Sequence, residues 1–340
     1  MKWPWQSRAL NDRLVMALTS ESFAYGRSVD GRLVRCGVEP RGDDTPQAFA
    51  RRIRSLGIES SQVTAVLPLH ECQLLQIDAP AVPPAELKSA ARWRIKDLVD
   101  AHLDDLTLDV MVVGDGRSRT QRQLFVAAAQ TRAIREVSEW SHAAGLALSV
   151  IDIAENAQRN LQSAVANALG RPGSASAALM QHGDTCLLTI CAQGELFYSR
   201  RLSWDREAPG GEGASAARPA AGAASPELQM VDFVDYGSDA PRDSAGAGDG
   251  APRFVIELQR SLDLWERSWP DLPLARLLVQ MGDDTQRVAA LLRDCLALPV
   301  EVLDPEAVFS DLNRYAGAPN VRAQVVPLLG ALLRAEARQL

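Results

Sequence analysis

The chain has 340 residues, of which 46% are hydrophobic, and its formal net charge is −7 at pH 7. A chain of this length can bury a large core and most naturally forms two domains. The acidic balance and the scattered arginines exclude a general nucleic-acid-binding protein, because neutralising phosphates requires a concentrated basic face.

The cysteines and histidines indicate neither a disulfide framework nor a metal site. The four histidines are far apart in the chain, and the cysteines include no C-x-x-C pair. We therefore expect reduced thiols that pack as small core residues, and no structural metal. The cysteines are Cys36, Cys72, Cys186, Cys191 and Cys295.

No apolar run reaches the length of a membrane-spanning helix, and the N-terminus lacks the apolar run of a signal peptide. We therefore expect a soluble protein of the cytoplasm. Trp3 and Trp5, with Lys2 and Arg8 nearby, suit either a contact with a membrane surface or a terminus tucked into the protein.

The first half of the chain alternates strands and helices. A β-meander is predicted from Arg13 to Cys36 around the turn Asp30-Gly31, and Thr45 caps a predicted helix that ends near residue 57. Strand, strand, helix, strand and strand over 62–125 predict a small α+β module with one helix on a sheet. A helix at 134–144, a strand at 146–153 and a helix at 154–169 follow. The break at 170–174 divides the chain into domains 1–170 and 175–340.

The second half begins with another meander, "ALMQHGDTCLLTICAQGELFYSRRL" at 178–202. Residues 205–252 are rich in Gly, Ala, Pro and Ser, so we expect a disordered loop. Its apolar island Leu228–Tyr236 is either a strand added to a sheet edge or a partner-docking motif. A helix at 254–265, a strand at 275–280, a turn at Met281-Gly282, a helix at 288–295, a strand at 299–303 and a helix at 323–337 complete the prediction.

Several blocks resemble one family in the same order along almost the whole chain. They are "IDAPAVPPAELKSAARWRIKDLVDAHLDDLTLDVMVV" (77–113), "LFVAAAQTRAIREVSEWSHAAGLALSVIDIAENAQRN" (124–160), "VIELQRSLDLWERSW", "LLVQMGDDTQRVAALLRDCLALPVEVLDP" and "VVPLLGALLR". Their order resembles the PilM-like proteins of type IV pilus assembly, and among them the branch that serves the MSHA pilus. The resemblance implies an α/β (α+β) protein with the bilobal actin-like ATPase fold. Its halves would be ribonuclease H-like, and the module at 62–125 would be the inserted subdomain.

Related proteins of this fold bind ATP between the two halves, so the resemblance also marks where a nucleotide site would lie. In the first meander, Ala17 and Thr19 stand about where the family pattern has Asp and Gly. In the second meander, Gln181 replaces the expected Asp, while Gly183 is retained and is followed by Asp184. Gln carries no charge to attract Mg²⁺, and Asp184 is displaced from the expected position.

The third place is the turn after the strand at 275–280. Met281-Gly282 stands where the family pattern has paired glycines, and we expect the Met281 side chain to point toward the adenosine position. Phosphoryl transfer depends almost entirely on positioning and electrostatic stabilisation. We therefore expect a degenerate site with no catalytic residue, no bound metal and no cofactor. Binding of ATP with Mg²⁺ at this site is the alternative.

The resemblance implies a scaffold that holds the short cytoplasmic tail of a single-pass, PilN-like inner-membrane protein, here of the MshJ type. It would associate peripherally with the inner membrane and could also contact the pilus assembly ATPase. By analogy the tail-binding groove involves the inserted module, while the oligomeric state stays open.

Enzymes on related folds are the rival hypotheses. A nucleotide hydrolase or phosphotransferase needs acids at both phosphate loops. A nuclease of the ribonuclease-like fold needs clustered carboxylates, for which Asp109 and Asp152 on predicted strands are candidates.

Three further residues are conspicuous in the sequence. Arg200 and Arg201 end a predicted strand, and we expect them to be solvated, with anchoring of an acidic partner as the alternative. Trp93 lies beside the apolar row of its predicted helix and could belong to the core or face a partner.

Overall fold

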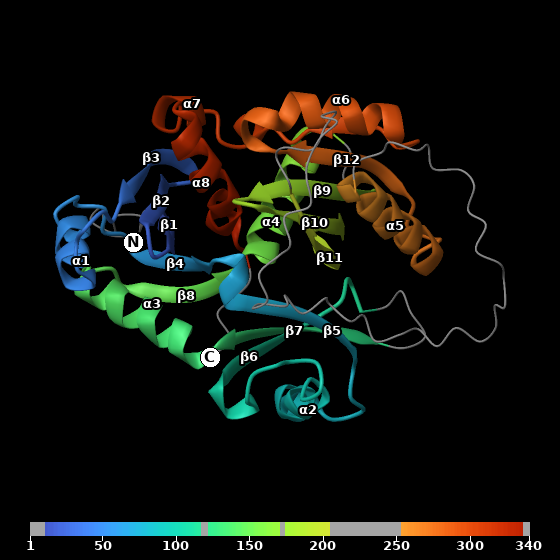
Figure 1. Ribbon diagram of the computed structural model, residues 1–340, viewed down its shortest axis with the longest axis horizontal. Coiled ribbons are helices and arrows are strands. Elements are labelled where there is room, and N and C mark those ends of the chain that lie inside the picture. The colour runs from blue at the N-terminus through green and yellow to red at the C-terminus, as the bar shows by residue number, and fades with distance from the viewer. Residues whose placement is uncertain (1–10, 117–121, 171–173, 205–252, 336–340) are drawn as a thin grey trace, which may run out of the picture.

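The computed structural model describes residues 11–116, 122–170, 174–204 and 253–335, and two five-stranded sheets form its framework (Figure 1). The first has the order β3-β2-β1-β4-β8 and the second β11-β10-β9-β12-β13. In each sheet an antiparallel meander is extended by two parallel strands. The strands of the first sheet are β1 (Asp12–Leu18), β2 (Ser22–Val29), β3 (Arg32–Pro40), β4 (Gln62–Leu67) and β8 (Leu148–Ile153). Those of the second are β9 (Ala175–His182), β10 (Thr185–Ala192), β11 (Glu195–Ser203), β12 (Leu274–Gln280) and β13 (Val300–Val302).

Both predicted meanders are present, and local chemistry explains the first. The β2–β3 turn places Asp30 at φ 49° and Gly31 at φ 80°. These angles suit the two residue types that most readily adopt positive φ.

Helices α1 (Pro46–Arg54) and α3 (Thr131–Ala143) pack together beside the first sheet. The Thr45 side chain accepts a hydrogen bond from the Ala48 backbone N–H, which confirms the predicted cap of α1. Trp140 of α3 packs against Phe23 and Phe49, with ring centroids 5.3 and 5.6 Å away. These aromatic contacts fix α3 to α1 and to the sheet.

The inserted module is a three-stranded antiparallel sheet of order β5-β7-β6, covered on one face by α2 (Leu87–Arg94). Its strands are β5 (Cys72–Asp78), β6 (Leu106–Val112) and β7 (Gln123–Gln130). The prediction that the module starts at residue 62 was wrong, because β4 pairs in parallel with both β1 and β8 of the first sheet. The opposite face of the module sheet joins the main core through Leu74 and Phe125.

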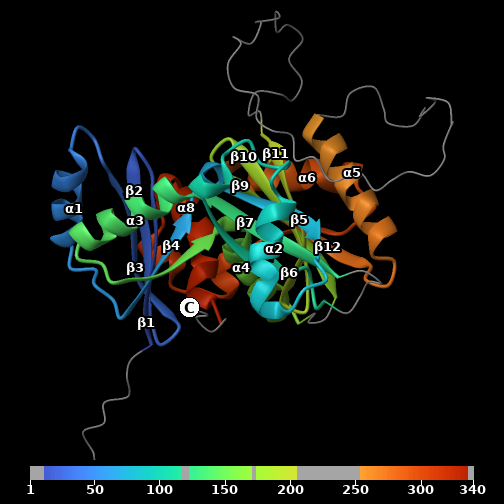
Figure 2. The same cartoon turned by 90° about the horizontal axis from the view of Figure 1, so that it is seen from below.

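Two helices, α4 (Ala154–Ala168) and α8 (Pro319–Leu329), lie between the two large sheets, as both views show (Figure 1, Figure 2). Here Val15 and Val66 of the first sheet share a core with Met180 and Leu278 of the second. Helix α8 contacts β1, β2 and β3 as well as β9, so the C-terminal segment returns from the second half to the first sheet. The last helix ends at Leu329 rather than near 337, and a 3-10 turn η6 (Gly330–Leu333) follows it.

Helix α5 (Arg253–Ser268) packs on β11, and α6 (Thr285–Cys295) packs on β12 and β13. The remaining elements are α7 (Leu312–Tyr315) and the 3-10 turns η1 (Leu69–Glu71), η2 (Pro84–Glu86), η3 (Leu103–Asp105), η4 (Gly282–Asp284) and η5 (Pro305–Ala307). The expectations for Trp3, Trp5, 205–252 and Leu228–Tyr236 concern residues outside the described ranges.

Candidate functional site

In the turn between β1 and β2, the side-chain hydroxyl of Thr19 is hydrogen-bonded to backbone N–H groups of the same turn. The Thr19 Oγ1 atom accepts hydrogen bonds from the backbone N–H groups of Glu21 (3.2 Å) and Ser22 (3.0 Å). The Ser22 hydroxyl donates to Gln324 Oε1 of α8 at 2.9 Å. Backbone N–H groups are what a phosphate loop offers to its ligand. In this turn two of them are already bonded within the protein.

The turn between β9 and β10 lies close to the one after β12. The Gln181 side-chain amide donates to the Gly183 carbonyl at 2.9 Å, and Gly183 has φ 63°. A Cβ atom on Gly282 would lie 3.5 Å from Gln181 Oε1. The fold therefore brings two of the three expected loops together, and α8 contacts both η4 and the strands of the first meander. Asp184 follows at the surface turn, where its backbone carbonyl accepts from Trp204 N–H.

The third turn is closed in the same manner as the first. The Thr285 hydroxyl accepts from the Met281 N–H at 2.8 Å and donates to the Gly282 carbonyl at 2.6 Å. We expected the Met281 side chain to point toward the adenosine position, but the structure places it elsewhere. It is fully buried in the main core, with its sulfur 3.6 Å from Cys186 Sγ. A flexible thioether suits such a filling role.

Asp184 lies on the second turn, and Asp283 and Asp284 lie on the third. Within the described ranges no group of three or more His, Cys, Asp or Glu side chains is arranged to hold a metal ion. Asp109 lies on β6 of the module, with an 84% exposed side chain, whereas the buried Asp152 ends β8 in the first sheet. The two nuclease candidates thus belong to different sheets.

A cavity of about 550 Å³ lies at the C-terminal ends of the inner strands β1 and β4 of the first sheet. Its walls come from the β1–β2 turn, the start of α1, the end of β4 with η1, and one side of α3. Leu18, Phe49, Leu67 and Trp140 supply apolar surface, and Thr19 of the first meander borders the same space. A cavity of this size and lining fits several side chains of an extended peptide or a small molecule.

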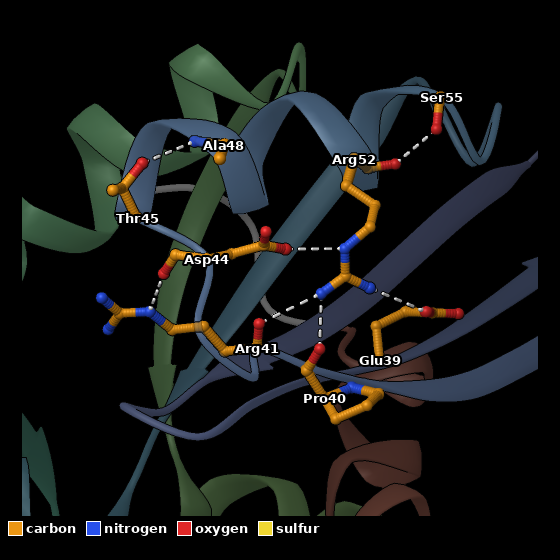
Figure 3. Close-up of polar contacts among 8 residues, drawn as sticks. All are labelled: Glu39, Pro40, Arg41, Asp44, Thr45, Ala48, Arg52 and Ser55. Atoms are coloured by element: carbon orange, nitrogen blue, oxygen red, sulfur yellow. Dashed lines mark hydrogen bonds and ion pairs between the residues drawn. The ribbon is translucent and has the colours of Figure 1, made fainter.

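Arg41 of the β3–α1 loop also lines the cavity, and Arg52 organises this loop (Figure 3). The Arg52 guanidinium pairs with Asp44 Oδ2 at 2.9 Å and with Glu39 Oε2 at 3.4 Å, and it also donates to the Pro40 and Arg41 carbonyls. Arg41 Nε in turn donates to the Asp44 carbonyl at 2.9 Å. These contacts make the loop a defined surface.

The rim of the cavity is predominantly acidic. It carries Glu71, Glu136 and Glu139 against the single guanidinium of Arg41 and the imidazole of His70. Glu136 forms a helical ion pair with Arg132, and His70 lies 3.6 Å from Glu71. With Glu136 paired, Glu71 and Glu139 leave a small excess of negative charge over Arg41, which favours a cationic ligand.

The part of the lining formed by η1 is held by Arg201 of β11. The Arg201 guanidinium donates to the Leu69 carbonyl at 2.6 Å, to the Cys72 carbonyl at 2.7 Å and to Glu155 Oε1 at 2.9 Å. Its neighbour Arg200 donates to Ser261 Oγ of α5 at 3.1 Å. The expectation that both arginines are solvated was wrong, because each side chain finds acceptors on an element distant in sequence.

A second buried carboxylate joins the halves beside Glu155. Asp152 Oδ2 pairs with Arg334 at 2.6 Å, and both carboxylate side chains are only 2% exposed. Arg13 of β1 donates to the Leu332 and Arg334 carbonyls. No local sequence pattern predicts these pairs, because each links residues more than 40 positions apart.

Burial perturbs several titrating groups near these contacts. Burial, together with the positive charge of Arg201, lowers the pKa of His182 to about 4. Burial raises the pKa of the Cys72, Cys186 and Cys191 thiols to about 12. Four of the cysteines are buried, as expected, while Cys295 is exposed.

The sequence left open whether Trp93 belongs to the core or faces a partner. In the structure its side chain is 71% exposed on α2.

The sequence matches no family model and no curated protein. Among solved structures it is similar to a chain described as "PilM-PilN type IV pilus biogenesis complex". The TM-score is 0.63 and the identity 18%, over 95% of this chain and 98% of the other.

Two weaker structural similarities have TM-scores of 0.41. One is to the cytoplasmic domain of EpsL, an inner-membrane component of the type II secretion system of Vibrio cholerae, with 14% identity over 56% of this chain and 71% of that one. The other is to a Bacteroides thetaiotaomicron protein with an actin-like ATPase fold and unknown function, with 6% identity over 88% and 93%. With the repeated sheet order, the stronger similarity shows that this chain has the bilobal actin-like fold. None of the helices in the described ranges has both the length and the apolar composition to cross a bilayer.

Proposed function

We propose that this protein is a scaffold of a type IV pilus assembly machine of the MSHA class, an MshI-type protein. It holds the cytoplasmic tail of a PilN-like inner-membrane protein of the MshJ type, and so works at the inner face of that membrane. The assembly ATPase is a second partner on this proposal. The supporting observation is the cavity of about 550 Å³ on a fold similar to that in the PilM-PilN complex.

The cavity suits the chemistry of such a tail. Its apolar interior accepts aliphatic side chains, and its acidic rim of Glu71, Glu136 and Glu139 attracts Lys and Arg. Cytoplasmic segments next to membrane-spanning helices are enriched in Lys and Arg. A basic and apolar tail would therefore be complementary to both parts of the site.

We also propose that the protein works without ATP hydrolysis. Thr19 and Thr285 occupy backbone N–H groups of two of the three turns, and Gln181 leaves the second turn without the expected carboxylate. The competing function, an ATP-hydrolysing switch on the same fold, requires these groups to be released and a metal ligand to be supplied.

A blocking substitution tests the docking site. Ala143 is the exposed last residue of α3 and lines the cavity, so a Trp at this position should obstruct it. We expect A143W to raise the Kd of a synthetic peptide with the tail sequence of the PilN-like protein from the same genome by tenfold or more. Calorimetric titration measures both proteins against this peptide.

Ala168 provides the matched control. It is the exposed last residue of α4 and does not line the cavity, so A168W introduces the same side chain at an equivalent helix position. Its Kd for the peptide should equal that of the wild type. Equal affinities for A143W and A168W would place the peptide elsewhere, and failure of the wild type to bind would refute the proposed partner.

A further inference from the structure

Two parts of the cavity lining, the β3–α1 loop and the turn η1, are anchored in different halves of the protein. The β3–α1 loop is organised by Arg52, which belongs to the same half as the cavity. The wall formed by η1 is instead held by Arg201, which lies on the edge strand β11 of the second sheet. The shape of the cavity therefore depends on how the second half sits against the first.

The Arg201 guanidinium holds both ends of the η1 turn. One acceptor is the carbonyl of Leu69, the first residue of η1, and the other is the carbonyl of Cys72, immediately after its last residue. Between these two points stand His70 and Glu71, which line the cavity. A planar fork of donors can fix two carbonyls at once in a way that a single ammonium cannot.

Glu155 keeps the guanidinium in place. Its carboxylate comes from α4, the helix between the two sheets, and accepts from Arg201 Nη2 at 2.9 Å. The same strand β11 makes another contact with the module, because the Leu196 carbonyl accepts from Gly114 N–H at 2.7 Å. Thus β11 contacts the first half at two places. Arg201 bonds to the turn η1, and Leu196 bonds to Gly114, just after strand β6 of the module.

We propose that Arg201 is a positioning residue that sets the cavity wall and couples the packing of the two halves to tail binding. This inference rests on the proposed function. Because coupling between two sites is reciprocal, a bound tail should also tighten the contact of β11 with η1. The proposal assigns to the second half a role in recognition although the cavity itself is lined by the first.

The test removes the guanidinium together with the buried carboxylate. Removing Arg201 alone would leave Glu155 buried without its partner, which would destabilise the protein for an unrelated reason. The R201M/E155Q variant avoids the uncompensated charge. R200M is the control, because Arg200 is adjacent on the same strand but bonds to Ser261 within the second half. Thermal unfolding of each variant establishes that the fold is retained.

The first measurement uses no ligand. Amide hydrogen exchange over 69–78 should become at least tenfold faster in R201M/E155Q and stay unchanged in R200M. The second measurement adds the synthetic tail peptide, whose Kd should rise about tenfold in the double variant, within the usual range of coupling between sites. R201K, which keeps the charge but loses the fork, should fall between the wild type and the double variant in both measurements.

The third measurement detects coupling directly. Adding the peptide should slow amide exchange in β11 of the wild type and leave the double variant unaffected. Unchanged exchange over 69–78 in the double variant would overturn the role of Arg201 whether or not the peptide binds. Altered exchange with an unchanged Kd would overturn the coupling. Failure of the wild type to bind the peptide would instead refute the proposed partner.

Discussion

The turn η6 packs closely on the backbone of α4 at Gly330, and G330A should destabilise the protein strongly. Gly330 opens η6 with φ −62° and ψ −26°, a conformation that alanine adopts without strain. Space is the obstacle. A Cβ atom here would overlap the Ala157 carbonyl oxygen of α4, and it would lie 2.7 Å from that carbonyl carbon and 2.9 Å from the Leu161 nitrogen.

The size of the effect follows from what must move. The obstructing atoms are backbone atoms of a helix, which cannot rotate away, so η6 and α4 must separate by about 1.5 Å to restore normal contacts. Overpacking of this kind costs about 1–3 kcal/mol. Separation also weakens the hydrogen bond from Asn160 Nδ2 to the Gly330 carbonyl, 3.2 Å long, which adds about 1 kcal/mol. We expect a loss of about 3 kcal/mol in the free energy of unfolding.

Urea unfolding followed by circular dichroism measures this loss, with G26A as the control. A Cβ on Gly26 would meet the side-chain atom Leu329 Cδ2 at 3.3 Å, and a flexible leucine can yield. G26A should therefore stay within about 1 kcal/mol of the wild type. If G330A costs no more than G26A, the halves do not pack as tightly as the contacts of α4 and η6 require.

Three further outcomes are expected. Because His182 is held neutral with a pKa of about 4, whereas an unfolded His titrates near 6.5, the unfolded chain binds more protons between these values. The free energy of unfolding should therefore fall from pH 6.5 to pH 4 by about 2 kcal/mol more than in H182N, measured by urea unfolding. Q181D should not acquire binding of Mg-ATP in calorimetric titration, because Thr19 still occupies backbone donors of the first turn; measurable binding would contradict this reasoning. W93A should change the free energy of unfolding by less than about 0.5 kcal/mol, since this side chain is 71% exposed; a loss above 1 kcal/mol would reveal an unrecognised packing role.

Local patterns predicted the elements whose causes are local. The Asp30-Gly31 turn and the Thr45 cap depend on residues within a few positions of one another, and both are present. Most meander strands have runs of consecutive buried residues, because both of their faces are covered. The second meander was predicted in the same way, and Gly183 and Asp184 form the turn between β9 and β10.

Long-range pairing escaped the sequence. Strand β4 has the composition of a buried strand, which suits either sheet, and only its pairing with β1 and β8 assigns it to the first. Met281 follows a strand at a turn, where a side chain is normally exposed, yet the fold directs it into the core. Arg201 looked like a solvated strand end because its acceptors, Leu69 and Cys72, are about 130 residues away in the chain.

The cavity escaped the sequence for a related reason. Phe49 and Trp140 lie in two separately predicted helices, and no local signal determines how far apart two helices lie. The space between them depends on the loop that Arg52 organises and on the turn that Arg201 holds. Neither arginine differs in its sequence neighbourhood from an ordinary surface arginine.

The same side-chain contacts bear on how the two halves can move. On the proposal that no nucleotide acts here, the link between the halves must come from the chain itself. The pairs Asp152–Arg334 and Glu155–Arg201 supply this link, since each joins an almost completely buried carboxylate to an arginine from a distant segment. Breaking either pair would strand a buried charge, at a cost of about 3–5 kcal/mol. Such contacts favour one arrangement of the halves, and a scaffold that keeps a peptide groove in shape needs just that arrangement to persist. On the same proposal, tail binding rather than nucleotide turnover strengthens this arrangement, because a bound tail tightens the contact of β11 with η1 that Arg201 makes.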